Sequence, residues 1–348
     1  MLADELDYVV GVDTHRDEHV LAVITVPAGA VVAGAAAATS GRGYRELLRV
    51  AERHAPGRRV WAIEGSGSYG AGLTRFLASR GETVLEVSRT PRSKRRLDGK
   101  DDTLDAVETA RAVLATERLA LPRSGGRREA LRLLLIARRS AIDVRRQALV
   151  QLRAVIVTAP DELRRELRAL PTTALLKRCS RLRRSSGPSD AVTTRLVLRS
   201  LARRAAAATS EADALEREIL SHVRALAPAL LDEPGIGPIV AAQLIVSWSH
   251  PGRVRSEAAF ARLAGVAPIP ASSGQTTRHR LSRGGDRQLN RALHTIVLHR
   301  RQHDEETKAY IARRIADGKS KRDATRLLKR YLARHLYRLL EQQQPLMA

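Results

Sequence analysis

The stretch DYVVGVDTHRDEHVLAVITVPAGAVVAGAAAA (residues 7–38) decides the fold, because apolar runs of strand length alternate in it with short polar breaks. The runs are DYVVGVD (7–13), HVLAVITV (19–26) and AVVAGAAAA (30–38). Runs rich in β-branched residues and bounded by polar turns are typical of strands. We therefore predict three short strands joined by tight turns.

The pattern downstream of residue 38 alternates between helix and strand. We expect helices over about 43–54, 71–80 and 101–117, and strands over 58–65 and 83–88. The first of these two strands ends at Glu64, and a Gly/Ser loop follows it. This order of elements is typical of a mixed sheet with helices on its faces. Residues 1–122 are thus predicted to form an α/β domain.

Leu, Ala and Arg at helical spacing dominate the middle of the chain. They predict one long helix over 131–157 and a second over 189–227, with an irregular piece between them. Two long helices joined in this way are typical of an antiparallel arm or coiled coil. We assign residues 123–228 to this arm.

The remaining segment, 229–348, reads as mostly helical. It opens with LDEPGIGPIVAAQLIV (231–246), where a turn containing Gly235 and Gly237 leads into an apolar helix. Helix-hairpin-helix modules have such a turn, and the backbone N–H groups at the helix start can bind a phosphate there. A Pro/Gly/Ser loop between two helices follows, and a basic helical tail over 305–340 closes the segment.

Net charge is distributed unevenly along the 348 residues, whose total is +24. Residues 1–122 are neutral overall, whereas 123–204 carry +15 and 278–338 carry +12. Concentrated basic charge without a hydrophobic amphipathic anchor favours a nucleic acid over a membrane surface as the partner. Aromatic residues make up only 3% of the chain, so base stacking is not expected to dominate recognition.

The sequence also predicts a cytoplasmic, nucleoid-associated protein. Its lone cysteine, Cys179, excludes an internal disulfide framework. No apolar run approaches the roughly 18 residues that a membrane helix needs. The start, MLADELDYVVGVD, carries acids where a secretory signal carries bases.

Four carboxylates are predicted to meet in the α/β domain. Asp13 ends the first strand and Glu64 the fourth, while Asp102 and Asp105 share one helix face. If the two strands are neighbours, these acids converge and repel one another unless a divalent cation lies between them. Oxygen ligands favour Mg²⁺ or Mn²⁺, and such ions support phosphodiester chemistry. Asp101 is an alternative to Asp102, since it also lies within a turn of Asp105.

Several motifs of the chain resemble those of insertion-sequence family one-ten, the DEDD transposases, which the IS116/IS110/IS902 group shares. They are GVDTHRDEHVLAV, VWAIEGSGSYG, KDDTLDA, PGIGPIVAAQL and FARLAGVAPIPASSGQTTRHRLSRGGDRQLNRAL. They occur in the family's order and cover nearly the whole chain. The resemblance implies a RuvC-like, ribonuclease H-like nuclease domain at the N-terminus and a transposase domain at the C-terminus. It also implies that Asp13, Glu64, Asp102 and Asp105 form the catalytic, metal-binding tetrad.

The family's nucleophilic serine corresponds to Ser273 in ASSGQ, with Ser272 as the adjacent alternative. Basic residues follow within ten positions, and arginines can hold a phosphate bidentately while a hydroxyl attacks. The residues expected to bind nucleic acid are Arg278, Arg280, Arg283, Gly235 and Gly237. The chain departs from the family pattern at Asp101, where threonine is common, and at Asp286, where asparagine is usual.

The resulting hypothesis is a DNA transposase that joins Ser273 to a DNA strand with the help of tetrad-bound metal ions. The resemblance implies a structured guide RNA encoded by the element, in addition to DNA of the element ends and the target. The helical arm and the two-site chemistry predict a homodimer that assembles into a tetramer. The alternatives are a metal-dependent junction nuclease that uses water and a catalytically inactive nucleic-acid-binding relic.

Overall fold

The computed structural model describes residues 5–87, 102–115, 120–123, 125–183, 186–271, 279–280, 282 and 284–342. The chain divides into two compact units. The first contains residues 1–125 together with the short segment 252–255, and the second contains 126–251 and 256–348. The sequence-based boundary at residue 228 falls inside the second unit and stays a prediction.

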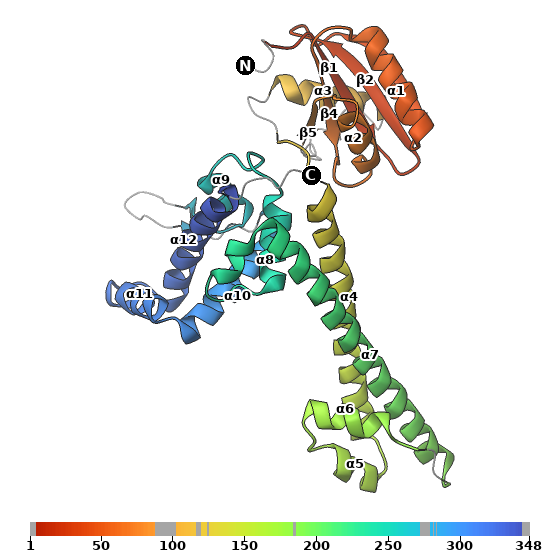
Figure 1. Ribbon diagram of the computed structural model, residues 1–348, viewed down its shortest axis with the longest axis vertical. Coiled ribbons are helices and arrows are strands. Elements are labelled where there is room, and N and C mark those ends of the chain that lie inside the picture. The colour runs from red at the N-terminus through yellow and green to blue at the C-terminus, as the bar shows by residue number, and fades with distance from the viewer. Residues whose placement is uncertain are drawn as a thin grey trace. The chain divides into compact units, whose positions relative to one another are not determined.

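A five-stranded mixed sheet forms the centre of the first unit (Figure 1), which confirms the predicted α/β class. Its strands are β1 (Tyr8–Thr14), β2 (Glu18–Thr25), β3 (Val31–Ala38), β4 (Arg59–Glu64) and β5 (Val84–Val87). The order across the sheet is β3-β2-β1-β4-β5. The pairs β1–β2 and β2–β3 are antiparallel, whereas β1–β4 and β4–β5 are parallel. The first and fourth strands are therefore neighbours, as the proposed carboxylate site requires.

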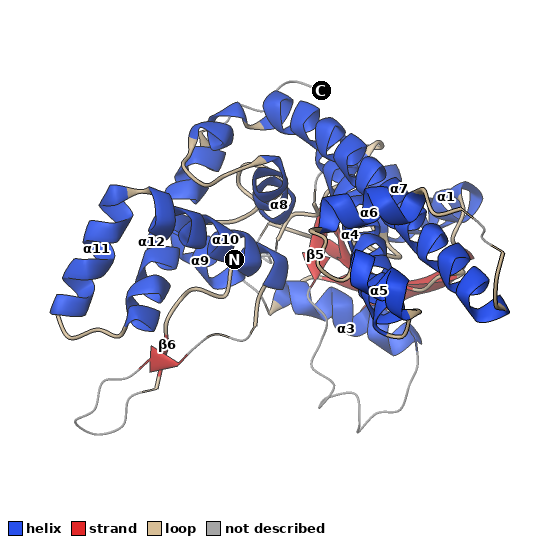
Figure 2. Cartoon of the chain, turned by 90° about the horizontal axis from the view of Figure 1, so that it is seen from below, coloured by secondary structure: helices blue, strands red, loops and turns tan. Residues whose placement is uncertain are grey.

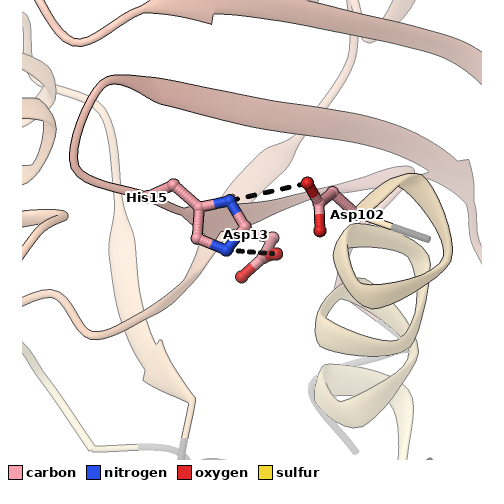
Figure 3. A group of neighbouring side chains, drawn as sticks. All are labelled: Asp13, His15 and Asp102. Atoms are coloured by element: carbon pink, nitrogen blue, oxygen red, sulfur yellow. Dashed lines mark ion pairs between the residues drawn. The ribbon is translucent and has the colours of Figure 1, made fainter. Parts of the chain in front are cut away.

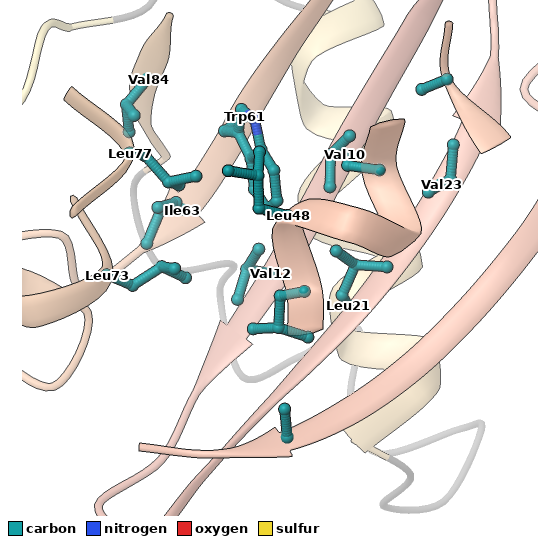
Figure 4. Close-up of a cluster of buried hydrophobic side chains, with 14 residues drawn as sticks. Val10, Val12, Leu21, Val23, Leu48, Trp61, Ile63, Leu73, Leu77 and Val84 are labelled. Atoms are coloured by element: carbon teal, nitrogen blue, oxygen red, sulfur yellow. The ribbon is translucent and has the colours of Figure 1, made fainter. Parts of the chain in front are cut away.

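One face of this sheet is covered by α1 (Gly41–His54) and α2 (Ala71–Ala78). Side chains alternate between the two faces of a strand, so every second residue points toward these helices. Val10, Val12, Trp61 and Ile63 do so and pack into one apolar core with residues of both helices (Figure 4). All four are buried.

The opposite face is covered by α3 (Asp102–Leu114). Val9 of β1 and Ala62 of β4 pack there with Ala110 and Val113 of the helix. Alternation along β1 then places Gly11 and Asp13 on this same face. Asp13, at the end of β1, therefore lies on the face covered by α3, which carries two of the three other predicted acids, Asp102 and Asp105.

The β5 edge of the sheet is covered by two segments from elsewhere in the chain. The Glu86 N–H donates to the Ala120 carbonyl at 2.7 Å, forming an isolated antiparallel bridge. The guanidinium of Arg253, from the segment 252–255, lies 3.2 Å from the Glu86 carboxylate. This short segment thus belongs to the first unit both by packing and by charge.

Two long helices, α4 (Gly126–Val157) and α7 (Ser189–Leu226), lie side by side in the second unit (Figure 1). They are antiparallel, because Arg138 pairs with Glu216 at 2.7 Å while Leu152 shares a core with Leu198. The prediction that the segment between them is irregular was wrong. This segment forms α5 (Asp161–Leu167) and α6 (Thr172–Ser180), whose buried leucines complete that core.

The rest of the second unit is helical around α8 (Pro238–Trp248), which follows the short 3₁₀ helix η2 (Pro228–Asp232). It contains α9 (Glu257–Leu263), α10 (Arg287–His303), α11 (Glu305–Ala316) and α12 (Lys321–Glu341). The predicted basic tail is thus helical but broken into α11 and α12, which pack on each other (Figure 2). Among the described helices, none is both long and apolar enough to cross a membrane.

Candidate metal centre

Two carboxylates and one imidazole come together where β1 meets α3 (Figure 3). His15 Nε2 lies 3.8 Å from Asp13 Oδ2, and His15 Nδ1 lies 3.6 Å from Asp102 Oδ2. One ligand atom from each residue falls within 4.8 Å of the other two. Asp13 is buried, whereas His15 and Asp102 are partly open to solvent. The group is therefore anchored in the sheet and accessible from outside.

Close approach of α3 to β1 creates this meeting point. A β-carbon on Gly11 would lie 2.6 Å from the backbone nitrogen of Ala110 and would clash with the helix. With glycine there, the helix backbone rests directly on the strand, two residues before Asp13. The first turn of α3 then carries Asp102 toward the end of β1.

Glu64 ends the neighbouring strand on the same face of the sheet. The register pairs Val12 with Ile63, so Asp13 and Glu64 are the next residues of two parallel strands. Val60 and Ala62 pack on the α3 side, and alternation along β4 puts Glu64 on that side too. The Thr14 hydroxyl donates to the Glu64 carbonyl at 2.8 Å and ties the two strand ends together.

Asp105 lies one turn after Asp102 on α3 and is partly buried. Within the described part of the chain, the group compact enough to share one ion contains Asp13 and Asp102 but neither Glu64 nor Asp105. The structure therefore brings two of the four predicted acids together directly and places the other two on the adjoining elements. Asp101, the alternative to Asp102, lies outside the described residues.

His15 is a member of this group that the sequence analysis missed. It stands two residues after Asp13, and residues two apart on an extended chain point to the same side. The spacing Asp-x-His at the end of a buried strand was therefore a usable signal. Its ring lies between the two carboxylates, with one nitrogen toward each.

The donor set fits a divalent cation. Carboxylate oxygens are the ligands that Mg²⁺ and Mn²⁺ prefer, and imidazole nitrogen is an additional donor that transition metals accept. One ligand oxygen of Asp13 and one of Asp102 lie within 4.8 Å of each other, so the two acids are near enough to bind the same cation. Glu64 ends the adjoining strand and Asp105 lies one helix turn after Asp102, outside this compact group.

The loop with the predicted nucleophile lies mostly outside the described residues, which include none of Ser272, Ser273, Arg278 and Arg283. Its stem is described. Ile269–Pro270 (β6) pairs with His279–Arg280 (β7), and the Asp286 N–H donates to the Leu263 carbonyl at 2.7 Å. Arg280 is exposed on that stem.

Asp286, one of the two departures from the family pattern, is the N-cap of α10. Its Oδ1 accepts from the backbone N–H of Gln288 at 2.8 Å and of Leu289 at 3.1 Å. Its Oδ2 accepts from the Ser247 hydroxyl at 2.6 Å, which joins α10 to α8. Aspartate and asparagine are both good N-caps, so the departure preserves the local structure of the loop stem.

Gly235 and Gly237 form the predicted turn before α8. Gly235 has a φ of +82°, which favours glycine, and the ring of His299 packs against it. Gly237 is the N-cap of α8, and a β-carbon there would meet no atom within 4 Å. The geometry leaves this helix start open, while phosphate binding by it stays a prediction.

Taken together, the fold and the site define an α/β domain with an acidic, metal-compatible centre, attached to a helical basic unit. Residues 10–159 match the family model described as Transposase (DEDD, IS110 type), and residues 227–312 match the model of the Transposase IS116/IS110/IS902 family. Two models of IS110-type transposases thus match separate parts of the chain, which supports its assignment as an IS110-family transposase.

The insertion element IS110 uncharacterized 43.6 kDa protein of Streptomyces coelicolor is a curated relative, 32% identical over 148 residues. The match covers 42% of this chain and 36% of the relative. The chain thus spans about a third of the length of the curated relative that it matches. The DEDD family model that matches residues 10–159 implies the use of a divalent metal, which agrees with the donor set at Asp13 and Asp102.

Proposed function

We propose that this protein is a DNA transposase that cuts and rejoins DNA strands by phosphoryl transfer. In this proposal Ser273 is the nucleophile, and Asp13, Glu64, Asp102 and Asp105 hold divalent metal ions, Mg²⁺ or Mn²⁺. The observation that carries it is the convergence of Asp13 and Asp102 at the end of β1, with Glu64 on the adjoining strand. The sheet order and the position of α3 support a RuvC-like, ribonuclease H-like fold for the first unit.

The four carboxylates would bind the metal ions next to the DNA phosphate that reacts. A divalent cation held there supplies stabilisation of the charge that develops on the phosphate oxygens. In the transfer, a bond forms between Ser273 Oγ and phosphorus as one ester P–O bond breaks, and the leaving oxygen takes up a proton. The covalent link conserves the ester bond energy, so rejoining needs no nucleotide cofactor.

The basic segments 123–204 and 278–338 supply the electrostatic attraction for the nucleic acids. We include a guide RNA encoded by the element among the partners, since the family resemblance suggests it and aromatic base-stacking residues are scarce. A homodimer that assembles into a tetramer would provide one serine for each strand exchanged. These partners belong to the proposal together with the serine mechanism.

The test is a denaturing gel of the full-length protein with Mg²⁺, labelled element-end DNA and RNA from the flanking region. We expect a labelled band retained on the wild-type protein and on Ser272→Ala but lost in Ser273→Ala. Retention by Ser273→Ala and loss in Ser272→Ala would reassign the nucleophile. Free cleaved DNA from Ser273→Ala at the wild-type rate would instead establish a nuclease that uses water.

A further inference from the structure

Several basic side chains lie near one another on α10 and α12, outside the candidate metal centre. These two helices pack against each other in the second unit. Lys329 of α12 is partly buried there, and its ammonium contacts the Asn290 side-chain oxygen of α10 at 3.4 Å. No carboxylate pairs with Lys329 within the described part of the chain. A partly buried ammonium with only a long contact to an amide oxygen is poorly compensated.

Further positive groups surround this lysine. His294 stands four residues after Asn290 on α10, hence on the same helix face, and Arg301 follows two turns later. Arg326 stands three residues before Lys329 on α12 and is the member with an acid partner, Asp323, at 3.2 Å. His294 and Arg301 have no acid partner among the described residues.

Burial and neighbouring positive charges both act on the pKa values of Lys329 and His294. Burial, and then the charge of Arg326, lower the pKa of Lys329 below its ordinary 10.5. Burial, and then the charges of Lys329 and Arg301, lower the pKa of His294 below 6.5. Both groups are thus held where a nearby anion would favour their charged forms.

Asn290 connects this cluster to the stem of the predicted serine loop. Its side-chain amide donates to the Ala264 carbonyl at 2.7 Å, so its oxygen is turned toward Lys329. A β-carbon on the adjacent Gly265 would lie 2.9 Å from the Gly284 carbonyl, on the other side of the same stem. Asn290 therefore links Lys329 by hydrogen bonds to Ala264, near the base of the loop that carries Ser273.

We propose that Lys329, His294 and Arg301 form a binding site for a backbone phosphodiester of the DNA strand presented to the serine loop. This inference rests on the proposed function. The phosphate supplies the negative charge that no described residue places beside Lys329, and Lys329 positions the strand through its contact with the stem. The positive charges of these residues repel one another in the free protein. A bound phosphate relieves this repulsion, which makes the free energy of binding more favourable.

Lysine footprinting of the full-length protein tests the location of the phosphate. The chain has only seven lysines, and an amine-reactive acylating reagent followed by mass spectrometry reports on each. We expect a labelled DNA duplex to protect Lys329 strongly and Lys308, which is paired with Glu305, much less. Protection by an RNA hairpin but not by DNA would overturn the assignment to the DNA strand. Unchanged acylation with both would overturn the site itself.

Lys329→Met separates a binding role from a structural one, with Lys321→Met on the exposed start of α12 as matched control. We expect Lys329→Met to unfold at the same or a higher temperature, because it removes a repelled cation. It should bind DNA several-fold more weakly, and the slope of log affinity against log salt should fall by about 0.9, the value for one phosphate contact. A lower melting temperature with unchanged binding would overturn the proposal.

Persistence of the covalent adduct in Ser273→Ala, with weaker DNA binding still seen in Lys329→Met, would overturn the serine chemistry alone. A failure of the cluster is recognised differently, by DNA affinity and salt slope that are identical in Lys329→Met and the wild type. The two proposals can therefore fail independently, since one is read from covalent attachment and the other from equilibrium binding.

Discussion

Gly11 and Ala106 are in such close contact that a β-carbon on Gly11 would lie 2.1 Å from the Ala106 carbonyl oxygen. Real β-carbons essentially never come within 3.0 Å of a heavy atom outside their own residue and its chain neighbours, so any side chain at residue 11 must move α3 away from β1. The distance between Asp13 and Asp102 depends on that packing, because the two acids come from the two elements in contact.

Gly11→Ala should therefore disrupt the metal centre without touching its ligands. We expect the free energy of unfolding to fall by about 1–3 kcal/mol, as for other overpacked cores, and metal-dependent DNA cleavage to be lost. Thermal unfolding and a cleavage assay measure the two effects. Gly34→Ala on β3 is the control, since its β-carbon would have 3.7 Å of clearance. Equal behaviour of the two variants would contradict the proposed packing requirement.

Asp102→Asn should abolish metal-dependent cleavage while the fold persists, because Asp102 is partly exposed at the start of α3. Loss of a residue that hydrogen-bonds to a metal ligand typically lowers metal affinity or activity about 10- to 100-fold. Loss of a ligand itself should lower them at least as much. Mg²⁺ should raise the melting temperature of the wild type but not of this variant. Asp17→Asn, which removes an exposed acid beside Arg16, should keep both responses.

His19 makes the first unit sensitive to acid. It is fully buried on β2 and stacks on Tyr44 with ring centroids 5.8 Å apart. Burial lowers its pKa below the ordinary 6.5, so the unfolded chain takes up a proton first as the pH falls. The free energy of unfolding should therefore decline from pH 6.5 downward, until the folded protein also protonates, by about 1.4 kcal/mol per unit of pKa difference.

Chemical denaturation of the wild type and of His19→Phe across that pH range measures this effect. Phenylalanine keeps the stacking on Tyr44 and cannot take up a proton. As the pH falls below 6.5, the variant should therefore lose less unfolding free energy than the wild type. A variant that declines as steeply as the wild type would place the acid sensitivity in other groups.

Asp286→Ala should destabilise the second unit by about 1–2 kcal/mol through loss of the α10 N-cap. The Ser247 hydroxyl would lose its acceptor at the same time. Asp286→Asn should be nearly neutral, because the amide oxygen can still accept from the Gln288 and Leu289 N–H groups. Urea unfolding distinguishes these outcomes, and equal losses in both variants would show that the charge, and not the cap, stabilises the helix start.

Sequence pattern was sufficient to predict the sheet because its strands are short, β-branched and separated by clear polar breaks. Each predicted strand agrees with an observed one to within two residues at either end. The pairing of β1 with β4 could be expected only from the family resemblance or from the acids themselves, since periodicity does not specify which strands are neighbours. The same resemblance pointed to the tetrad, of which Asp13 and Asp102 converge directly.

What the sequence analysis missed depends on tertiary contacts. The segment between α4 and α7 contains the proline-bounded helices α5 and α6, each too short to show a clear period, and their helical state follows from burial of Leu163, Leu167 and Leu175. His15 has no acidic side chain and so did not belong to the carboxylate pattern, although its spacing of two residues from Asp13 was informative. The pairing of Arg253 with Glu86 joins residues 167 positions apart and has no local signal.

Because of that last contact, the first unit is encoded by two separate stretches of the gene. Its residues do not form one continuous stretch of the gene, because Arg253 and its neighbours are encoded within the region for the second unit. A truncation after residue 125 would leave Glu86 without this partner, and a chimaera that exchanges only the N-terminal half between relatives would pair a foreign sheet edge with the resident segment. Recombination between related genes near codon 125 would create the same mismatch between Glu86 and the segment 252–255. Substitutions at Glu86 and at Arg253 are therefore expected to occur together.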